Sequence, residues 1–295
     1  MAGVTTLKRR ITSVKNTRQI TKAMELVSAS KMRHAQEYAI NSRPFKEQAR
    51  LLIGQLSSVS DAKLDDLFAN RPVKNELLVV VCSDQGLAGA YNSNVLKKFI
   101  EIIKQNKADK INTDVISIGR YAGKFVAKHK GLNHHSAYPM LGDHPSPQAI
   151  APMIEVITSH YLQKKIDRVK VVYTQFISSI RQEVVSVALI PYLIDPDDKK
   201  TETRELSPLE VAIFEPSVEE IIESVGIRLI EVQLWQALLE AGASEQSMRM
   251  MAMKNASDNA GDIIEDLTLA LNTARQAAIT QEIAEIVGGA EAVKS

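Results

Sequence analysis

Residues 260–278 read AGDIIEDLTLALNTARQAA, and this stretch decides the fold class. Its apolar side chains recur at alternating steps of four and three, the spacing of a heptad seam along one face of a long helix. The seam consists of Ala260, Ile264, Leu267, Leu271, Ala274 and Ala278. Upstream, Ser217 and Glu220 have the spacing of a capping box, and no proline follows Pro216. The pattern therefore predicts about seventy helical residues, roughly 105 Å in length.

A second long helix is predicted at the other end of the chain. Its apolar positions lie at Val4, Leu7, Ile11 and Val14, and then at Ile20, Met24 and Val27. Pro44 removes a backbone donor, so we expect it to bend or interrupt this helix. Fifty residues would still reach about 75 Å.

Helices of this length cannot fold into a compact core about 30 Å across, so each needs a partner along its length. Residues 1–50 carry eleven basic and three acidic side chains, a net charge of +8, whereas residues 217–295 carry five basic and thirteen acidic ones, a net charge of −8. Opposite charges of this size favour pairing of the two helices with each other. Because the middle of the chain connects them, we expect an antiparallel coiled coil.

The middle of the chain has a different pattern. Residues 77–81, LLVVV, are typical of a strand buried on both faces. Further strands are predicted at 114–118, 169–176 and 183–190, the last two paired as a hairpin, with helices at 94–105, 121–130 and 149–165, a loop at 131–147 and a polar connector at 195–208. This alternation indicates a mostly parallel sheet. The predicted fold class is α/β with long helices: an antiparallel coiled coil plus a central Rossmann-like α/β domain. The segments are 1–58, 75–195 and 209–288.

The strand at 77–81 leads into a turn, SDQGLAGAYN at 83–92, where a nucleotide phosphate could bind. Only Gly86 and Gly89 are present, so the dinucleotide-binding fingerprint is incomplete, and no Walker A motif occurs. A structural turn is therefore favoured over a nucleotide site. An α/β nucleotide-binding enzyme with helical extensions remains an alternative, as does a coiled-coil adaptor for nucleic acid.

Other candidate sites are weak. His134, His135 and His144 share a region with Asp143, but a neighbouring histidine pair is poor evidence for a metal, and a solvated polar loop is favoured. The lone Cys82 follows the buried strand and is interpreted as a small core residue. No run of eighteen apolar residues is present, so direct membrane insertion is not expected.

Four segments resemble one family. Residues 7–25 resemble the amino-terminal helix of the gamma subunit of F-type ATP synthases, 83–89 resembles that family's strand-to-helix turn, and 251–260 and 274–283 resemble its carboxyl-terminal helix. The resemblance implies a central rotor shaft that couples proton-driven rotation of the c-ring to conformational changes at the catalytic sites of the beta subunits, and that regulates ATPase activity and proton flow. It implies no active site, cofactor or metal in this chain. The implied partners are three alpha and three beta subunits, the epsilon subunit and the c-ring, with no nucleic acid.

The resemblance also implies contact residues. The residues implied to face the beta subunits are Arg9, Arg10, Lys22, Met24, Arg275, Gln276, Thr280 and Glu282. An apolar tip that would turn within a sleeve consists of Ile283, Ile286, Val287 and Ala290. Since no transit segment is evident, we expect a bacterial protein bound peripherally to the cytoplasmic face of the inner membrane.

Overall fold

The computed structural model describes residues 2–59, 67, 71–129, 131–142, 146–191 and 218–294. The expected cap at Ser217, the residues Asp143 and His144, and the connector at 195–208 lie outside the described residues. Two compact units are present, Met1–Ala29 with Arg249–Ser295 and Ser30–Met248. We call them the shaft unit and the sheet unit. The division into 1–58, 75–195 and 209–288 stays a prediction, because it describes segments of chain rather than compact units.

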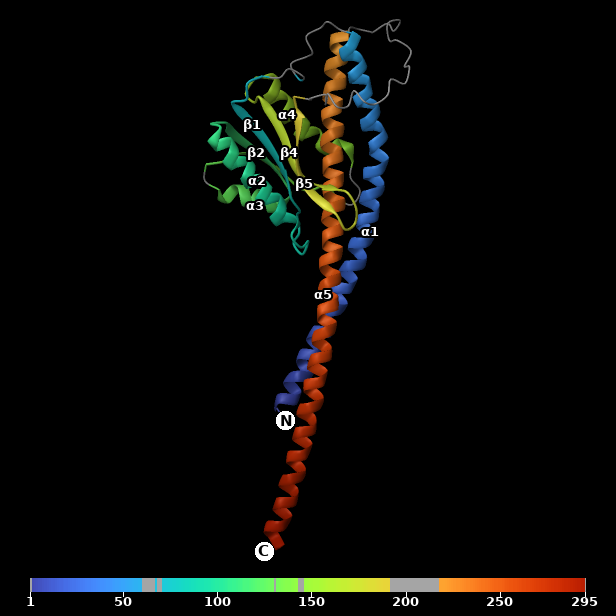
Figure 1. Ribbon diagram of the computed structural model, residues 1–295, viewed down its shortest axis with the longest axis vertical. Helices are drawn as coiled ribbons and strands as arrows, with labels where there is room; N and C mark the ends of the chain where they lie inside the picture. Colours follow the sequence, from blue (N-terminus) through green and yellow to red (C-terminus); the bar gives the residue numbers. More distant parts are fainter. Residues whose placement is uncertain are drawn as a thin grey trace. The chain divides into compact units, whose positions relative to one another are not determined.

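Two long helices contribute to both units. Helix α1 runs from Ala2 to Val59, and helix α5 runs from Val218 to Lys294 (Figure 1). The expected interruption at Pro44 does not occur, since α1 continues through this residue. Loss of one backbone hydrogen bond at an exposed position does not end the helix.

In the shaft unit, the start of α1 lies antiparallel to the end of α5 (Figure 1). On α5, Met253, Ser257 and Ala260 are buried, and Ile264, Leu267, Leu271, Ala274 and Ala278 are half-buried. On α1, Val4, Leu7 and Val14 are half-buried and Ile11 is buried. Both helices thus place one residue at every third or fourth position against the partner.

The seam of α1 departs from the expected one after Val14. Thr21 and Ser28 are buried there, whereas Ile20 is 61% exposed and Val27 is 54% exposed. The prediction that Ile20 and Val27 share the seam is therefore wrong. A seam that repeats every seven residues continues from Val14 to Thr21 and Ser28, and small polar side chains occupy it where bulky ones were expected.

The described residues of the sheet unit form a five-stranded sheet in the order β3-β2-β1-β4-β5. They are β1 Asn75–Val81, β2 Asn112–Ile118, β3 Asn133–Tyr138, β4 Arg168–Phe176 and β5 Gln182–Ile190. Strands β1 to β4 are parallel, and β5 is antiparallel to β4. The predicted α/β fold class is confirmed. The interpretation of 131–147 as a loop is wrong for 133–138, because β3 is a sheet-edge strand whose polar residues alternate between exposed and half-buried.

Helices cover both faces of the sheet. Helix α2 (Tyr91–Ala108) and helix α3 (Arg120–Lys128) pack on one face, against the side chains of Leu78, Val80 and Val172. On the other face, a short 3-10 helix η1 (Pro147–Ile150), helix α4 (Ala151–Leu162) and residues 225–241 of α5 pack against Leu77, Val79 and Val171. Consecutive residues of β1 therefore enter different cores, as a strand covered on both faces requires.

A buried polar network fixes α5 within the sheet unit. The Gln236 amide donates to the Ala39 carbonyl of α1 at 3.2 Å and to Glu240 at 2.9 Å. The Tyr173 hydroxyl donates to the other oxygen of Glu240 at 3.4 Å, and burial together with this carboxylate raises the pKa of Tyr173. The Ser244 hydroxyl donates to the Thr174 carbonyl at 3.0 Å. These bonds tie β4, α5 and the sheet-unit part of α1 together.

Candidate functional site

The surface of the shaft unit carries most of the residues singled out in the sequence. On α1, Arg9, Arg10 and Lys22 are exposed and Met24 is half-buried. The Lys22 ammonium forms an ion pair with Glu25 at 3.0 Å, one helical turn along. Met24 is half-buried and so lies at the edge of the seam, whereas Lys22 points away from it, because residues two apart on a helix face different sides.

The residues singled out on α5 are exposed. Arg275 and Gln276 directly follow the seam residue Ala274, and Thr280 and Glu282 lie one to two turns further along. None of these four makes a hydrogen bond or ion pair with another described residue. Their polar groups are thus available to a partner along the exposed surface of α5.

The guanidinium of Arg18 lies against Gly261 within the seam. A Cβ placed on Gly261 would be 3.4 Å from Cζ of Arg18. Counting along antiparallel helices from this contact places Ala2 opposite about residue 277 of α5. Beyond that point α5 continues without α1 beside it, as Figure 1 shows.

This single-helix end of α5 exposes its apolar side chains. Every residue from Ile279 to Val287 is exposed, and Ile286 reaches 71%. Ile283 and Val287 share one helical face, four residues apart. Ala290 lies in the helix, but its side chain is outside the described residues. An exposed apolar helix end of this kind is a surface suited to a protein partner.

Sequence reasoning missed several seam residues. Arg18, Thr21, Ser28, Ser257 and Gly261 occupy or border the seam, although none is apolar and bulky. Steps of seven from Val14 on α1, and of three or four back from Ala260 on α5, would have identified the three hydroxyl-bearing residues. Arg18 lies beside Gly261 because of the register in which α1 and α5 pair. The sequence of either helix alone does not reveal that register.

The turn after β1 is held by its own side chains. Asn92 accepts a hydrogen bond from the Ser83 backbone N–H at 3.0 Å and donates to the Ser83 hydroxyl at 2.7 Å. Asp84 accepts from the backbone N–H groups of Arg120 at 2.8 Å and Met140 at 3.2 Å. The side chains of Ser83, Asp84 and Asn92 are thus engaged in holding the turn together and joining it to the start of α3 and to Met140. A structural role for the turn fits this geometry.

The histidines are distributed over the sheet unit. His134 bonds to the Ser117 hydroxyl at 2.8 Å, whereas the Nε2 atoms of His135 and His160 are 3.4 Å apart. Within the described part of the chain, no three His, Cys, Asp or Glu residues form a group that could hold a metal ion. Cys82 is fully buried, in agreement with its interpretation as a core residue, and burial raises its pKa to about 12.

Comparison with known proteins identifies the arrangement. A family model described as "ATP synthase" matches residues 3–293. The fold is similar to a chain of the central stalk and c-ring structure of Tetrahymena thermophila mitochondrial ATP synthase, with a TM-score of 0.61 and 23% identity over 81% of this chain and 99% of that chain. It is also similar to a chain of the Euglena gracilis mitochondrial ATP synthase OSCP/F1/c-ring structure, with a TM-score of 0.68 and 19% identity over 99% of this chain and 95% of that chain. A chain of the Euglena rotor structure matches with a TM-score of 0.60 and 17% identity, over 94% of this chain and 99% of that chain.

Proposed function

Because the chain belongs to the gamma-subunit family of ATP synthases, we propose that its shaft unit transmits torque between the c-ring and the catalytic alpha and beta subunits. Members of this family are non-catalytic stalk subunits, and ATP chemistry takes place in the beta subunits. This chain is accordingly the central rotor shaft. The observation that carries the mechanism is the continuous seam between α1 and α5.

A seam of this kind suits a shaft. A single helix bends readily, whereas two helices whose side chains interlock resist bending and twisting. The small residues Ser28 and Ser257 are buried in the seam, where short side chains let the two helices pack closely and move together. Torque applied at one end is then delivered at the other with little lag.

The contact residues are part of the proposal. Exposed Arg9, Arg10 and Lys22, with Met24, would meet the beta subunits along α1, and Arg275, Gln276, Thr280 and Glu282 would meet them along α5. A polar group at one position around the coil would engage a given beta subunit at only one rotor angle. Such engagement would regulate ATPase activity and proton flow.

The tip would turn inside the ring of alpha and beta subunits. Exposed Ile283, Ile286 and Val287, with Ala290 beyond them, would slide against an apolar sleeve without breaking directional bonds. The sheet unit would meet the epsilon subunit and the c-ring. We further propose that the assembly lies at the cytoplasmic face of a bacterial inner membrane. Among the described helices, none has the length and apolar character needed to cross a bilayer.

Rotation of the assembled complex tests the shaft role. Lys107 is exposed at the end of α2, and Cys82 is buried, so a Lys107→Cys variant offers one accessible thiol for attaching a bead. With alpha and beta subunits immobilised, ATP should drive stepwise rotation in one direction. A complex that hydrolyses ATP while the bead stays still would refute the proposal, and wild-type chain, which lacks the accessible thiol, controls for unspecific attachment.

A further inference from the structure

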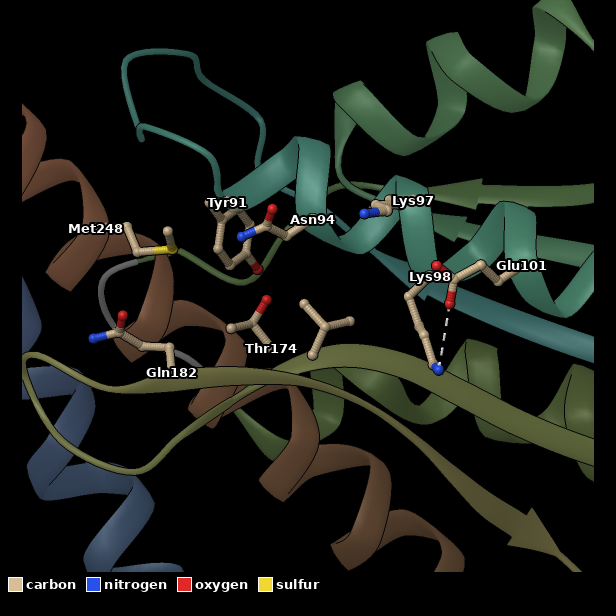
Figure 2. Close-up of a pocket in the computed structure, with 9 residues that line it drawn as sticks. Tyr91, Asn94, Lys97, Lys98, Glu101, Thr174, Gln182 and Met248 are labelled. Carbon is tan, nitrogen blue, oxygen red and sulfur yellow. Dashed lines mark ion pairs between the residues drawn. The ribbon is translucent and has the colours of Figure 1, made fainter.

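A pocket in the sheet unit lies beside the carboxyl end of β4, on the face of the sheet that α2 covers. The connections from β1 to β2 and β3 proceed toward one edge, whereas β4 lies on the opposite side of β1. The crevice of this reversal lies between β1 and β4, whereas no residue of β1 lines the pocket, which lies one strand further along the sheet, at β4 and β5. The pocket has a volume of about 240 Å³ and lies between α2, β4, the start of β5 and Met248 of α5 (Figure 2).

The floor of the pocket contains a buried hydroxyl. Thr174 is 2% exposed, and its Oγ1 has no hydrogen-bond partner among the described residues. Figure 2 shows this hydroxyl pointing toward α2, into the space that the labelled side chains surround. A buried hydroxyl without a partner is unfavourable, so it favours a ligand that accepts or donates a hydrogen bond there.

The other polar side chains that line the pocket favour a ligand with a negative charge. Lys97 makes no ion pair within the described part of the chain, whereas Lys98 is paired with Glu101 at 3.5 Å. One positive charge on the rim is thus uncompensated. Asn94 adds an amide that can donate, and the Gln182 Nε2 already donates to Ser247 at 3.1 Å, which holds that side chain in place.

The size of the pocket limits the ligand. Pockets for drug-sized molecules and cofactors have volumes of roughly 300–1,000 Å³, so about 240 Å³ suits something smaller than a nucleotide. Val184 and Met248 supply an apolar wall for a short carbon chain. We propose that this pocket binds a small free oxyanion, a carboxylate or a phosphate, with Lys97 binding the charge and the Thr174 hydroxyl bonding to an oxygen.

This proposal does not rest on the rotor role. The pocket belongs wholly to the sheet unit, and the incomplete glycine motif of the turn at 83–89 has no part in it. The interaction would be a point charge plus a neutral hydrogen bond, without the glycine-rich backbone cradle of a nucleotide site.

Titration calorimetry of the full chain at low ionic strength tests the proposal, with inorganic phosphate, succinate and ADP as separate probes. We expect one phosphate or succinate per chain, and the probe that binds identifies the anion class. Thr174→Val and Lys97→Gln should each weaken binding at least tenfold, and Thr174→Ser should retain it. Lys104→Gln, which changes an exposed lysine of the same helix outside the pocket, should have no effect.

Several results would overturn the proposal. The proposal is wrong if neither phosphate nor succinate shows saturable binding. It is also wrong if Lys104→Gln weakens binding as much as Lys97→Gln does, or if ADP binds more tightly than phosphate. Binding restricted to a synthetic glutamate-containing peptide would assign the pocket to a protein partner instead. Since Lys97 is exposed, its replacement leaves folding intact and keeps the test decisive even if Thr174→Val unfolds the chain.

Discussion

Arg18 and Gly261 contact each other across the seam of the shaft unit, with the arginine Cζ 3.4 Å from the position that a Cβ on residue 261 would occupy. An alanine there would make an ordinary van der Waals contact with the end of a flexible side chain. Glycine inside a helix costs about 1 kcal/mol relative to alanine. The glycine therefore permits a close approach but is not required for it.

Gly261→Ala should raise the free energy of unfolding by about 0.5–1 kcal/mol, as measured by chemical denaturation. Gly119→Ala supplies the contrast. Gly119 has φ +88°, and a Cβ there would be 1.9 Å from the Cys82 carbonyl oxygen. This substitution should destabilise the chain by more than about 2 kcal/mol. Destabilisation by Gly261→Ala would show that Arg18 cannot move aside.

Ile264 and Ile263 are neighbours with different surroundings. Ile264 is half-buried in the seam, whereas Ile263 is 48% exposed. Ile264→Ala should lower the free energy of unfolding by about 1–2 kcal/mol, less than for a fully buried isoleucine. Ile263→Ala is the matched control and should change it by less than about 0.5 kcal/mol. Equal losses of stability in the two variants would contradict the placement of Ile264 in the seam.

Arg275 is proposed to contact a beta subunit. Arg275→Ala should reduce the torque-generating turnover of the assembled complex about tenfold, because a hydrogen bond to a charged group contributes about 1.5 kcal/mol. The measurement is ATP-driven rotation of the bead-labelled complex under load. Lys254→Ala removes another exposed positive charge from α5 and should leave turnover unchanged. A similar loss in both variants would point to net charge alone.

Cys82 should not react with thiol reagents in the folded protein. Burial is the main cause that raises its pKa to about 12, and Glu245 adds to the effect, so the thiolate is scarce at neutral pH. Modification by iodoacetamide at pH 8 should be slow in buffer and fast in denaturant. Rapid modification of native protein, followed by mass spectrometry, would contradict the buried position.

His160 should make stability depend on pH. Burial lowers its pKa below 6.5, His135 and Lys165 lower it further, and Asp114 opposes them. The unfolded state then binds the proton more readily, so stability present above pH 6.5 is lost as the pH falls below this value. Denaturation curves between pH 7.5 and 5.5 should show a smaller loss for His160→Gln than for wild type. If stability fell equally with pH in His160→Gln and in wild type, groups other than His160 would cause the pH dependence.

The sequence was sufficient to predict the elements with strong periodicity. Residues 77–81 form a buried strand, and the α5 seam residues occur at the spacing that the apolar side chains indicated. Strand β3 was not predicted, because NHHSAY is polar and only pairing with β2 makes it a strand. Edge strands of this kind depend on a neighbour more than on their own composition.

The candidate site was less predictable. Ile20 and Val27 are apolar but exposed, and Thr21 and Ser28 are polar but buried, so hydrophobicity alone gave the wrong face of α1 after Val14. The pocket at Thr174 was invisible because its walls come from α2, β4, β5 and α5, which are far apart in the chain. Tertiary arrangement, rather than any local motif, creates both features.

The repeat of seven residues in the α1 and α5 seams has a mechanical consequence. Because 3.5 residues per turn is fewer than the 3.6 of a straight helix, the pair coils with a left hand. Rotation applied in one sense winds such a pair tighter and presses its side chains together, while the opposite sense opens the winding. Making and consuming ATP would therefore load this element unequally, and its torsional compliance should differ between the two directions of turning.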